Sequence, residues 1–318
     1  MNFALPLFPE QASTMADRVD TLVFFLVGVS VFFATLICIL IISFAIKYRR
    51  RSEDERPPAV RSDIRLEIFW TVVPLGLTLI MFVWGTKLYF TTFTPPANSL
   101  EISVVAKQWM WKAQHPEGQR EINELHIPIG RPVKLILTSQ DVIHDFSVPA
   151  FRVKRDVVPG RYTTVWFEAN KTGEYHLFCD QYCGTQHAGM IGSVVVMKQA
   201  EYQTWLGGQT TGISAAAAGE RLFQQLACNT CHGESATSRG PSLVGLFGRT
   251  VKLEGEGSVT ADEGYIRESI LNPQAKIVAG YRPIMPTFKG LITEDGILEI
   301  VAYLKSLARE ERQQAKNE

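Results

Sequence analysis

Two long stretches without a charged residue lie in the first hundred residues, and they restrict the possible folds more than any other feature. Residues 21–46 and 68–86 contain no Asp, Glu, Lys or Arg over 26 and 19 positions. About 20 apolar residues in a helix cross the ~30 Å hydrocarbon core of a bilayer. We therefore predict an N-terminal segment, residues 1–98, with two transmembrane helices at about 21–46 and 68–90. The alternative is a core hairpin of a soluble protein.

The segment between these stretches has an excess of positive charge. Residues 47–66 contain seven basic and four acidic residues, whereas the first 20 residues contain one basic and three acidic residues. Cytoplasmic loops of membrane proteins are enriched in Lys and Arg. We therefore expect a two-pass protein of the bacterial inner (cell) membrane, in contact with lipid. This short loop would lie in the cytoplasm, and both termini and everything after residue 90 would lie outside.

Residues 99–200 have short apolar runs separated by Gly, Pro and Asn. The runs with the length and composition of strands are residues 101–105, 132–138, 163–167, 175–178 and 192–197. Short strands separated by turns at this spacing indicate an all-β sandwich or barrel of about 100 residues. Basic and acidic residues number 32 each in the whole chain. No global charge therefore favours a nucleic-acid partner.

Potential metal ligands gather in this all-β segment. They are His144, Cys179, Cys183, His187 and Met190, four of them within the sequence CDQYCGTQHAGM. Thiolates, imidazoles and thioethers suit copper, and a mononuclear blue-copper site uses only one Cys. The second Cys therefore favours two coppers that share both sulfurs. Each copper would bind one His, with Met190 as a weak ligand to one copper and a backbone carbonyl to the other.

A disulfide and a zinc site are the alternatives to copper at these residues. Cys179 and Cys183 could form a disulfide in an oxidising compartment, or the cluster could bind zinc with four ligands. Neither alternative accounts for the Met at the end of the run. Among the remaining histidines, we expect His115 to be solvated in a turn and His126 to be a hydrogen-bonded structural residue.

A further domain is predicted at residues 218–310, after a small-residue linker at 201–217 and before a charged tail at 311–318. Residues 218–227 and 293–307 have helical spacing of apolar residues. Between them, the sequence CNTCH places Cys228, Cys231 and His232 in the c-type haem attachment pattern. We expect the two sulfurs to bind haem covalently and His232 to bind its iron. A zinc half-site or a thioredoxin-like pair is the alternative.

Met285 is the expected sixth ligand of the haem iron. No His or Cys follows His232, and Met285 is the only later methionine. Prolines on both sides of Met285 disfavour a helix there. A His/Met haem has a raised reduction potential. An iron with an open or water-bound sixth position is the alternative.

Several motifs together resemble subunit II of haem-copper cytochrome c oxidases. Besides residues 179–190, they are EIFWTVVP (67–74), KQWMW (107–111), NELHIP (123–128) and DVVPGR (156–161). The resemblance implies a cupredoxin fold at 99–200 and a binuclear copper A centre in which the backbone carbonyl of Gln181 joins the five side-chain ligands. The C-terminal segment resembles a class I cytochrome c, as in the fused-haem branch of the aa-type oxidases. The expected fold is thus a transmembrane hairpin, an all-β cupredoxin domain and an all-α cytochrome c domain.

The same resemblance implies roles for three further residues. Electrons would enter the copper centre through Trp109, and Glu67 would lie near the mouth of a proton path into subunit I. The alternatives are a packing role for Trp109 and, for Glu67, a solvated carboxylate favoured by the helix dipole. Many members have Glu where this chain has Gln181, and that Glu holds magnesium at the boundary with subunit I. Its replacement puts a magnesium ion in doubt.

We therefore expect the electron-input subunit of a terminal respiratory cytochrome c oxidase. Its partners would be subunit I, subunit III, and a cytochrome c-type donor or an upstream quinol-oxidising complex. Electrons would pass through haem c and copper A to haem in subunit I, where oxygen becomes water and protons are pumped. No catalytic residue is expected in this chain itself. The alternatives are the copper subunit of a nitric oxide reductase, and a membrane-tethered electron carrier or copper-handling protein without catalytic partners.

Overall fold

The computed structural model describes residues 8–53, 55, 63–208, 213–233, 238–255 and 257–317, without the side chains of residues 310 and 312–317. These residues form two compact units. One consists of residues 14–94, and the other contains the remaining residues of the chain. Each unit is described separately.

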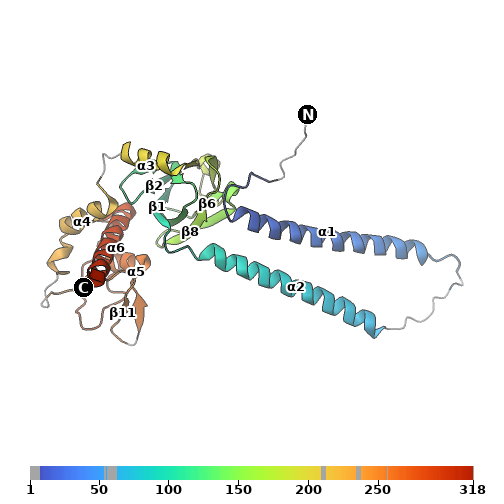
Figure 1. Cartoon of the computed structure of the whole chain (residues 1–318). Coiled ribbons are helices and arrows are strands. Elements are labelled where there is room, and N and C mark those ends of the chain that lie inside the picture. The colour runs from blue at the N-terminus through green and yellow to red at the C-terminus, as the bar shows by residue number, and fades with distance from the viewer. Residues whose placement is uncertain are drawn as a thin grey trace. The chain divides into compact units, whose positions relative to one another are not determined.

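The smaller unit is a hairpin of two long helices, α1 (Ala16–Lys47) and α2 (Ile64–Phe93) (Figure 1). Phe25 of α1 packs against Trp84 of α2, with ring centroids 5.3 Å apart. Both helices are longer than predicted because their polar flanks continue the helix, and the Asp63 side chain caps α2 by accepting a hydrogen bond from the Arg65 backbone N–H.

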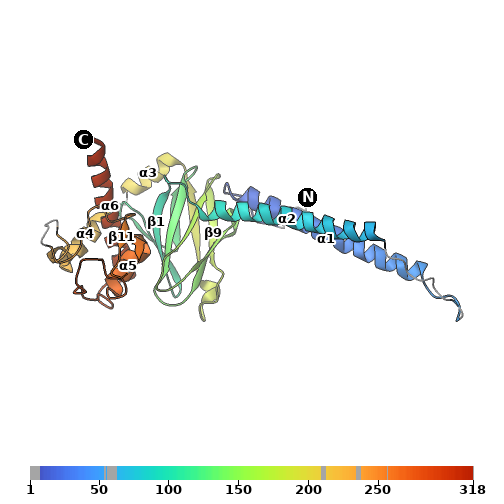
Figure 2. The ribbon, with the colours of Figure 1, turned by 90° about the horizontal axis from the view of Figure 1, so that it is seen from below.

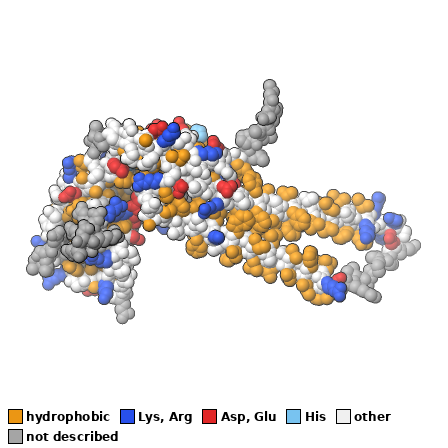
Figure 3. Space-filling view, in the orientation of Figure 1, with side chains coloured by type: hydrophobic (Ala, Val, Ile, Leu, Met, Phe, Trp, Pro, Cys, Tyr) orange, Lys and Arg blue, Asp and Glu red, His pale blue; other side chains and the backbone are white. Residues whose placement is uncertain are grey.

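Apolar side chains cover the hairpin, as Figure 3 shows, and Lys and Arg gather where α1 ends and α2 begins. The side chains of Phe32 and Phe82 are 62% and 68% exposed. Helices that are apolar on every face require an apolar environment. Both are long and apolar enough to cross a membrane.

Residues 100–197 form a sandwich of two five-stranded sheets, which Figure 2 marks by β1 and β9. In spatial order, the first sheet is β3 (Arg120–Ile122), β2 (Met110–Gln114), β1 (Leu100–Lys107), β5 (Pro132–Ser139) and β8 (Thr163–Glu168). The second is β4 (Glu124–Pro128), β10 (Ile191–Met197), β9 (Gly173–Cys179), β6 (His144–Val148) and β7 (Val153–Val157). The five predicted strands are confirmed as β1, β5, β8, β9 and β10.

Alternating residues of both sheets fill the core of the sandwich. Its largest members include Trp111, Phe146, Phe151 and Phe167, all with at most 2% of their surface exposed. Trp111 and Phe146 meet edge to face at 5.4 Å. This packing fixes the ends of the strands from which the candidate metal ligands extend.

Helix α3 (Gln199–Gly208) occupies the first part of the segment expected to be a linker. Its side chains Tyr202 and Leu206 are buried in the sandwich core, at 1% and 6% exposure. The Gln119 side chain also donates a hydrogen bond of 2.7 Å to the Leu206 carbonyl. Residues 199–208 therefore pack with the sandwich, and residues 209–212 lie outside the described part of the chain.

The expectation that His115 is solvated was wrong, because its side chain is fully buried. Although His115 does precede a turn, its ring is enclosed beside α3, with Nδ1 3.0 Å from the Tyr202 hydroxyl and Nε2 2.7 Å from Glu121 Oε1. The other Glu121 oxygen pairs with His126 Nδ1, and the His126 ring stacks on Trp205. His126 is thus the hydrogen-bonded structural residue that was predicted.

Replacing Glu121 by Gln should destabilise the sandwich by about 1–3 kcal/mol, because the ring nitrogens of His115 and His126 then lose a charged hydrogen-bond partner. Burial raises the pKa of Glu121, but hydrogen bonds from His115 and His126 lower it to about 2. The stabilisation is therefore complete above pH 4.5, the ordinary pKa of this carboxyl group, and is lost as the pH falls toward 2. The hydrogen bond to Glu121 raises the pKa of His126, so its contribution is lost as the pH rises through that raised value.

Thermal unfolding of the detergent-solubilised chain in a pH series that extends from the Glu121 pKa of about 2 to alkaline pH would measure this effect. Glu124→Gln is the matched control, since Glu124 is an exposed carboxylate on the same strand as His126. A Glu121→Gln variant that unfolds at the same temperature as the Glu124→Gln variant would contradict the prediction.

The described residues of the C-terminal domain include three α-helices and a short β-hairpin. They are α4 (Ala215–Gln225), α5 (Glu263–Leu271), α6 (Glu294–Asn317), β11 (Thr250–Lys252) and β12 (Ser258–Thr260). The two predicted helices are confirmed as α4 and α6, and α6 continues through the charged tail. Ile297, Val301 and Leu304 of α6 are buried in the core of this domain, together with Ile266 of α5.

Candidate metal centre and haem cavity

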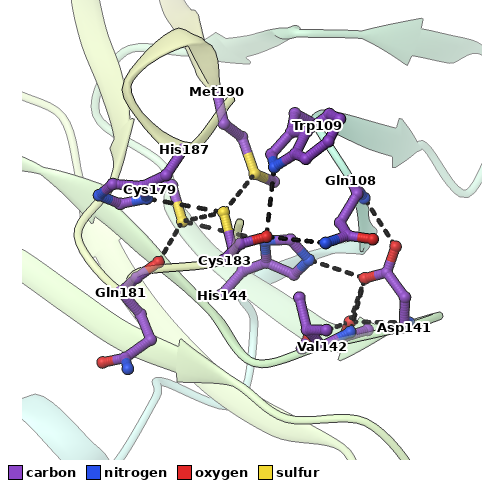
Figure 4. A network of polar contacts seen from close by, with 11 residues as sticks. Gln108, Trp109, Asp141, Val142, His144, Cys179, Gln181, Cys183, His187 and Met190 are labelled. Carbon is purple, nitrogen blue, oxygen red and sulfur yellow. Dashed lines mark hydrogen bonds and ion pairs between the residues drawn. The ribbon is translucent and has the colours of Figure 1, made fainter. Parts of the chain in front are cut away.

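The five side chains predicted to bind copper converge at one end of the sandwich (Figure 4). His144 begins β6 and Cys179 ends β9, and antiparallel pairing of these two strands brings the two residues together. The loop after β9 carries Cys183 and His187, and Met190 directly precedes β10. Sheet pairing and one tight loop thus assemble the whole set of donor atoms.

The distances divide these donors into two similar halves. Cys179 Sγ lies 3.7 Å from Cys183 Sγ, too far for the ~2.05 Å bond of a disulfide, and both cysteines are free. Cys179 Sγ is 3.9 Å from His144 Nδ1 and 3.2 Å from the carbonyl oxygen of Gln181. Cys183 Sγ is 3.6 Å from His187 Nδ1 and 3.8 Å from Met190 Sδ. Each sulfur therefore has one imidazole and one weaker donor beside it.

Four of the six candidate donor residues are buried, whereas His187 is half-buried and Gln181 is exposed. His144 and Met190 are fully buried, and Cys179 and Cys183 are almost so. Burial raises the pKa of Cys179, but hydrogen bonds with His144, with the backbone of Asp145 and Gln181 and with Cys183 together outweigh burial and lower the pKa to about 6. Burial and the neighbouring Cys179 sulfur raise the pKa of Cys183. A cationic centre between the sulfurs would favour the second thiolate, and soft sulfur donors with imidazoles are the set that copper prefers.

Two residues that the sequence did not single out hold this centre from outside. Asp141 Oδ1 is 2.9 Å from His144 Nε2, and its other oxygen accepts a hydrogen bond of 2.7 Å from the Gln108 backbone N–H. The Gln108 side chain in turn donates to the carbonyl oxygen of Cys183 at 2.8 Å. The only available sequence signal was the position of Asp141, three residues before a ligand candidate.

Trp109 is half-buried beside the same loop, where its Nε1 donates a hydrogen bond of 3.2 Å to the Cys183 carbonyl oxygen. This approach requires glycine at position 184, where φ is +118° and a Cβ atom would lie 3.2 Å from the indole. The role of Trp109 in electron transfer stays a prediction.

Glu67 lies in the first turn of α2, in the separate hairpin unit, and its role in proton uptake also stays a prediction.

The residues predicted to bind haem line one cavity of about 580 Å³ in the C-terminal domain. Cys228 and Cys231 lie in and directly after a short 3-10 helix, Cys228–Thr230, and His232 follows. Met285 lines the cavity too, with apolar side chains from three helices and the segment after α5. A cavity of this volume, mostly apolar and with a few polar groups, is typical of cofactor sites.

The orientation of His232 suits an axial ligand. Its Nδ1 lies 2.9 Å from the Pro241 carbonyl oxygen, which can only accept a hydrogen bond. Nδ1 therefore carries the proton, and Nε2 keeps the lone pair that can bind a metal. The described lining of the cavity includes Arg and Lys but no Asp or Glu, which suits the two carboxylates of haem.

Comparisons with known proteins agree with this fold. Residues 119–198 match the family model described as the periplasmic domain of cytochrome c oxidase subunit II, and residues 214–304 match the model of cbb3-type cytochrome c oxidase subunit III. Cytochrome c oxidase subunit 2 of Alkalihalophilus pseudofirmus is 30% identical over 276 residues, which cover 82% of this chain and 79% of that protein.

Two further relatives come from Bradyrhizobium. An alternative cytochrome c oxidase subunit 2 of Bradyrhizobium diazoefficiens is 30% identical over 52% of this chain and 71% of its own length. The crystal structure of the periplasmic domain of subunit II of Bradyrhizobium japonicum cytochrome oxidase is 31% identical and covers 36% of this chain and 96% of its own, with a TM-score of 0.35. The chain belongs to the cytochrome c oxidase subunit II family and carries a cytochrome c domain fused behind the periplasmic domain of that family.

Proposed function

We propose that this chain is the electron-input subunit of a terminal respiratory cytochrome c oxidase. Its cytochrome domain would accept electrons from a cytochrome c-type donor or an upstream quinol-oxidising complex. Its cupredoxin domain would deliver them to the haem of subunit I, where oxygen is reduced to water and protons are pumped. The observation that carries the proposal is that one chain of the subunit II family has both a sulfur-rich donor cluster and a CNTCH segment that lines a cavity.

The cupredoxin domain would hold two copper ions as a copper A centre, which supplies a one-electron redox couple when bound. The proposed ligands are His144, Cys179, Cys183, His187, Met190 and the carbonyl oxygen of Gln181. The surrounding protein keeps water away from the sulfurs, and Asp141 orients the His144 ring. The Gln181 side chain points away from the sulfurs in Figure 4. Its amide is neutral, so we propose no magnesium ion there.

The C-terminal domain would hold one haem c, which supplies the second one-electron couple. Cys228 and Cys231 would form the covalent bonds to the haem, and His232 and Met285 would bind its iron. The hydrogen bond to Pro241 fixes the His232 tautomer that can do so. Fusion of this domain to the cupredoxin domain keeps the donor at an effective concentration in the millimolar range expected for short linkers.

The chain is a two-pass membrane protein with a periplasmic domain. We propose that the basic loop after α1 faces the cytoplasm and that both cofactor domains lie outside. Association with subunit III and a role for Glu67 in proton uptake are part of the same proposal. The proposal also includes the domain limits 1–98, 99–200 and 218–310. The one change is that residues 199–208 pack with the sandwich.

Electron paramagnetic resonance of the oxidised full chain, matured with haem and loaded with copper, would test both cofactors. We expect hyperfine structure from one unpaired electron shared equally over two coppers, beside a low-spin ferric haem signal. A single-copper or copper-silent spectrum from fully loaded protein would exclude the copper A centre. A high-spin haem signal would exclude Met285 as the sixth ligand.

Purification from the native membrane would test the partner and the reaction. We expect a large haem-copper subunit to accompany the chain and the complex to reduce oxygen. Turnover of nitric oxide instead would identify a nitric oxide reductase. Isolation of the chain without a catalytic partner would favour a membrane-tethered carrier.

A further inference from the structure

One buried leucine of the cytochrome domain lies against the outer face of the cupredoxin sandwich. Leu298 of α6 is 5% exposed and packs with Val105 of β1, Ile136 of β5 and the ring of Tyr162. We name these three residues of the sandwich the Leu298 seat.

The Leu298 seat belongs to the outside of the sandwich. On β1, Val104 and Ala106 are members of the sandwich core, and on β5 so are Leu135 and Leu137. Because successive side chains of a strand point to opposite faces, Val105 and Ile136 point away from that core. They are nevertheless only 2% and 4% exposed. The helix that carries Leu298 accounts for their burial.

Helix α6 has two distinct faces at this point. Ile297, Ile300, Val301 and Leu304 pack in the core of the cytochrome domain. Leu298 and Glu299 follow Asp295 by three and four residues, and Lys305 follows Leu298 by seven, which are spacings that place side chains on one side of a helix. All four contact residues of the sandwich. One face of α6 thus builds its own domain, and the other meets the sheet.

Charged residues surround the Leu298 seat, and their signs match across the contact. Lys112 is 2.5 Å from Asp295, and Arg120 pairs with Glu299. Lys305 of α6 is 2.7 Å from Glu101 of β1 and 2.8 Å from Glu263 of α5, and Lys134 of β5 pairs with both of these carboxylates. Arg267 also donates a hydrogen bond of 2.6 Å to the Gly160 carbonyl oxygen.

A buried apolar side chain surrounded by polar pairs is the usual anatomy of a stable interface. Partly exposed ion pairs contribute little individually, so the burial of Leu298 dominates the contact. The residues of the cytochrome domain that make this contact do not line the haem cavity. They are Glu263, Arg267, Asp295, Leu298, Glu299 and Lys305. The contact is therefore made by residues other than those that line the cavity.

We propose that Leu298 docks the cytochrome domain on the cupredoxin sheet as a fixed module, so that the domain does not swing on the linker between them. The docking implies that electrons pass between a haem and a copper centre held in one arrangement. This consequence rests on the proposed function, because it assumes that haem and copper are bound. The docked arrangement itself does not depend on the identity of the cofactors.

Acetylation of lysines in the full chain, at trace reagent concentration and followed by mass spectrometry, tests the docking. Lys134 and Lys305 lie in the contact, and exposed Lys198 of the sandwich is the internal reference. We expect both contact lysines to react several-fold more slowly than Lys198. Leu298→Glu should raise both rates toward that of Lys198, whereas Leu291→Glu should not, because Leu291 is 73% exposed in the same domain.

A second variant keeps the test decisive if Leu298→Glu fails to fold. Ile136→Glu puts the same charge on the sandwich side of the contact and leaves the cytochrome domain unchanged, so it should release Lys305 to a similar extent. Contact lysines that react as fast as Lys198 in the unaltered chain would overturn the docking. Protection that survives both variants would overturn the role of Leu298. Haem and copper contents of the same samples, measured by optical and paramagnetic resonance spectra, test the proposed function independently.

Discussion

Replacing Cys183 by Ser should abolish the paired-copper signal and leave the haem spectrum unchanged. Cys183 Sγ lies within 3.8 Å of three other candidate donors, Cys179 Sγ, His187 Nδ1 and Met190 Sδ. A hydroxyl is a much harder ligand than a thiolate and cannot replace it at copper. Loss of this sulfur therefore removes the bridge and separates His187 and Met190 from the other half of the site. We expect copper content to fall from two ions per chain to one or none.

Elemental analysis and paramagnetic resonance of the purified chain would measure the loss. Cys38→Ser is the matched control, since Cys38 is an exposed cysteine of α1 in the separate hairpin unit. That variant should keep both coppers. A Cys183→Ser variant that retained two coppers with a shared unpaired electron would refute the bridging role.

The donor cluster was predictable because most of its residues lie close together in the sequence. Four of the five side chains lie within residues 179–190, and sulfur and imidazole donors have few other reasons to gather on one loop. The fifth, His144, needed the pairing of β6 with β9 to reach Cys179. The haem attachment segment is local in the same way. The strands β1, β5, β8, β9 and β10 were predicted because their apolar runs are long enough to stand out.

Contacts that depend on tertiary structure were not predictable. Helix α3 was missed because its sequence ends in small residues, although Tyr202 and Leu206 have the four-residue spacing of a buried helical face. His115 has a turn on one side in the sequence, and only the packing of α3 over it explains its burial. The short strands β2 and β3 lack a long apolar run, because the sandwich buries only alternate residues in them.

The role of Leu298 shows a further limit of periodicity. Its neighbours Ile297 and Val301 follow the apolar spacing of a helix that covers one core, and that spacing correctly predicted α6. An additional leucine beside this face gives no indication of whether water or another domain covers it. Asp141 is a similar case, because its contact with Gln108 depends on how the β5–β6 loop meets the turn between β1 and β2.

Gly219→Ala should destabilise the cytochrome domain by about 3 kcal/mol, because overpacking in a tight interior forces neighbouring backbone to move. Helices α4 and α6 are in tight contact here, since a Cβ atom at position 219 would lie 1.9 Å from the Glu299 carbonyl oxygen. That atom is part of a helix backbone and cannot rotate away. Since Ile300 and Leu304 of the same helix line the haem cavity, separation of the helices would also disturb the surroundings of the iron.

Thermal unfolding followed by haem absorbance would measure this loss. Gly264→Ala is the control within the same domain, because a Cβ atom there would make only an ordinary contact of 3.4 Å with Asp262. Alanine is also the better helix former, although Gly264 is the second residue of α5 and gains less than the about 1 kcal/mol that applies to a helix interior. The two substitutions add the same methyl group to two helices of one domain and should shift the melting temperature in opposite directions. Equal shifts would mean that α4 can move away from α6 at little cost, which would contradict the tight crossing at Gly219.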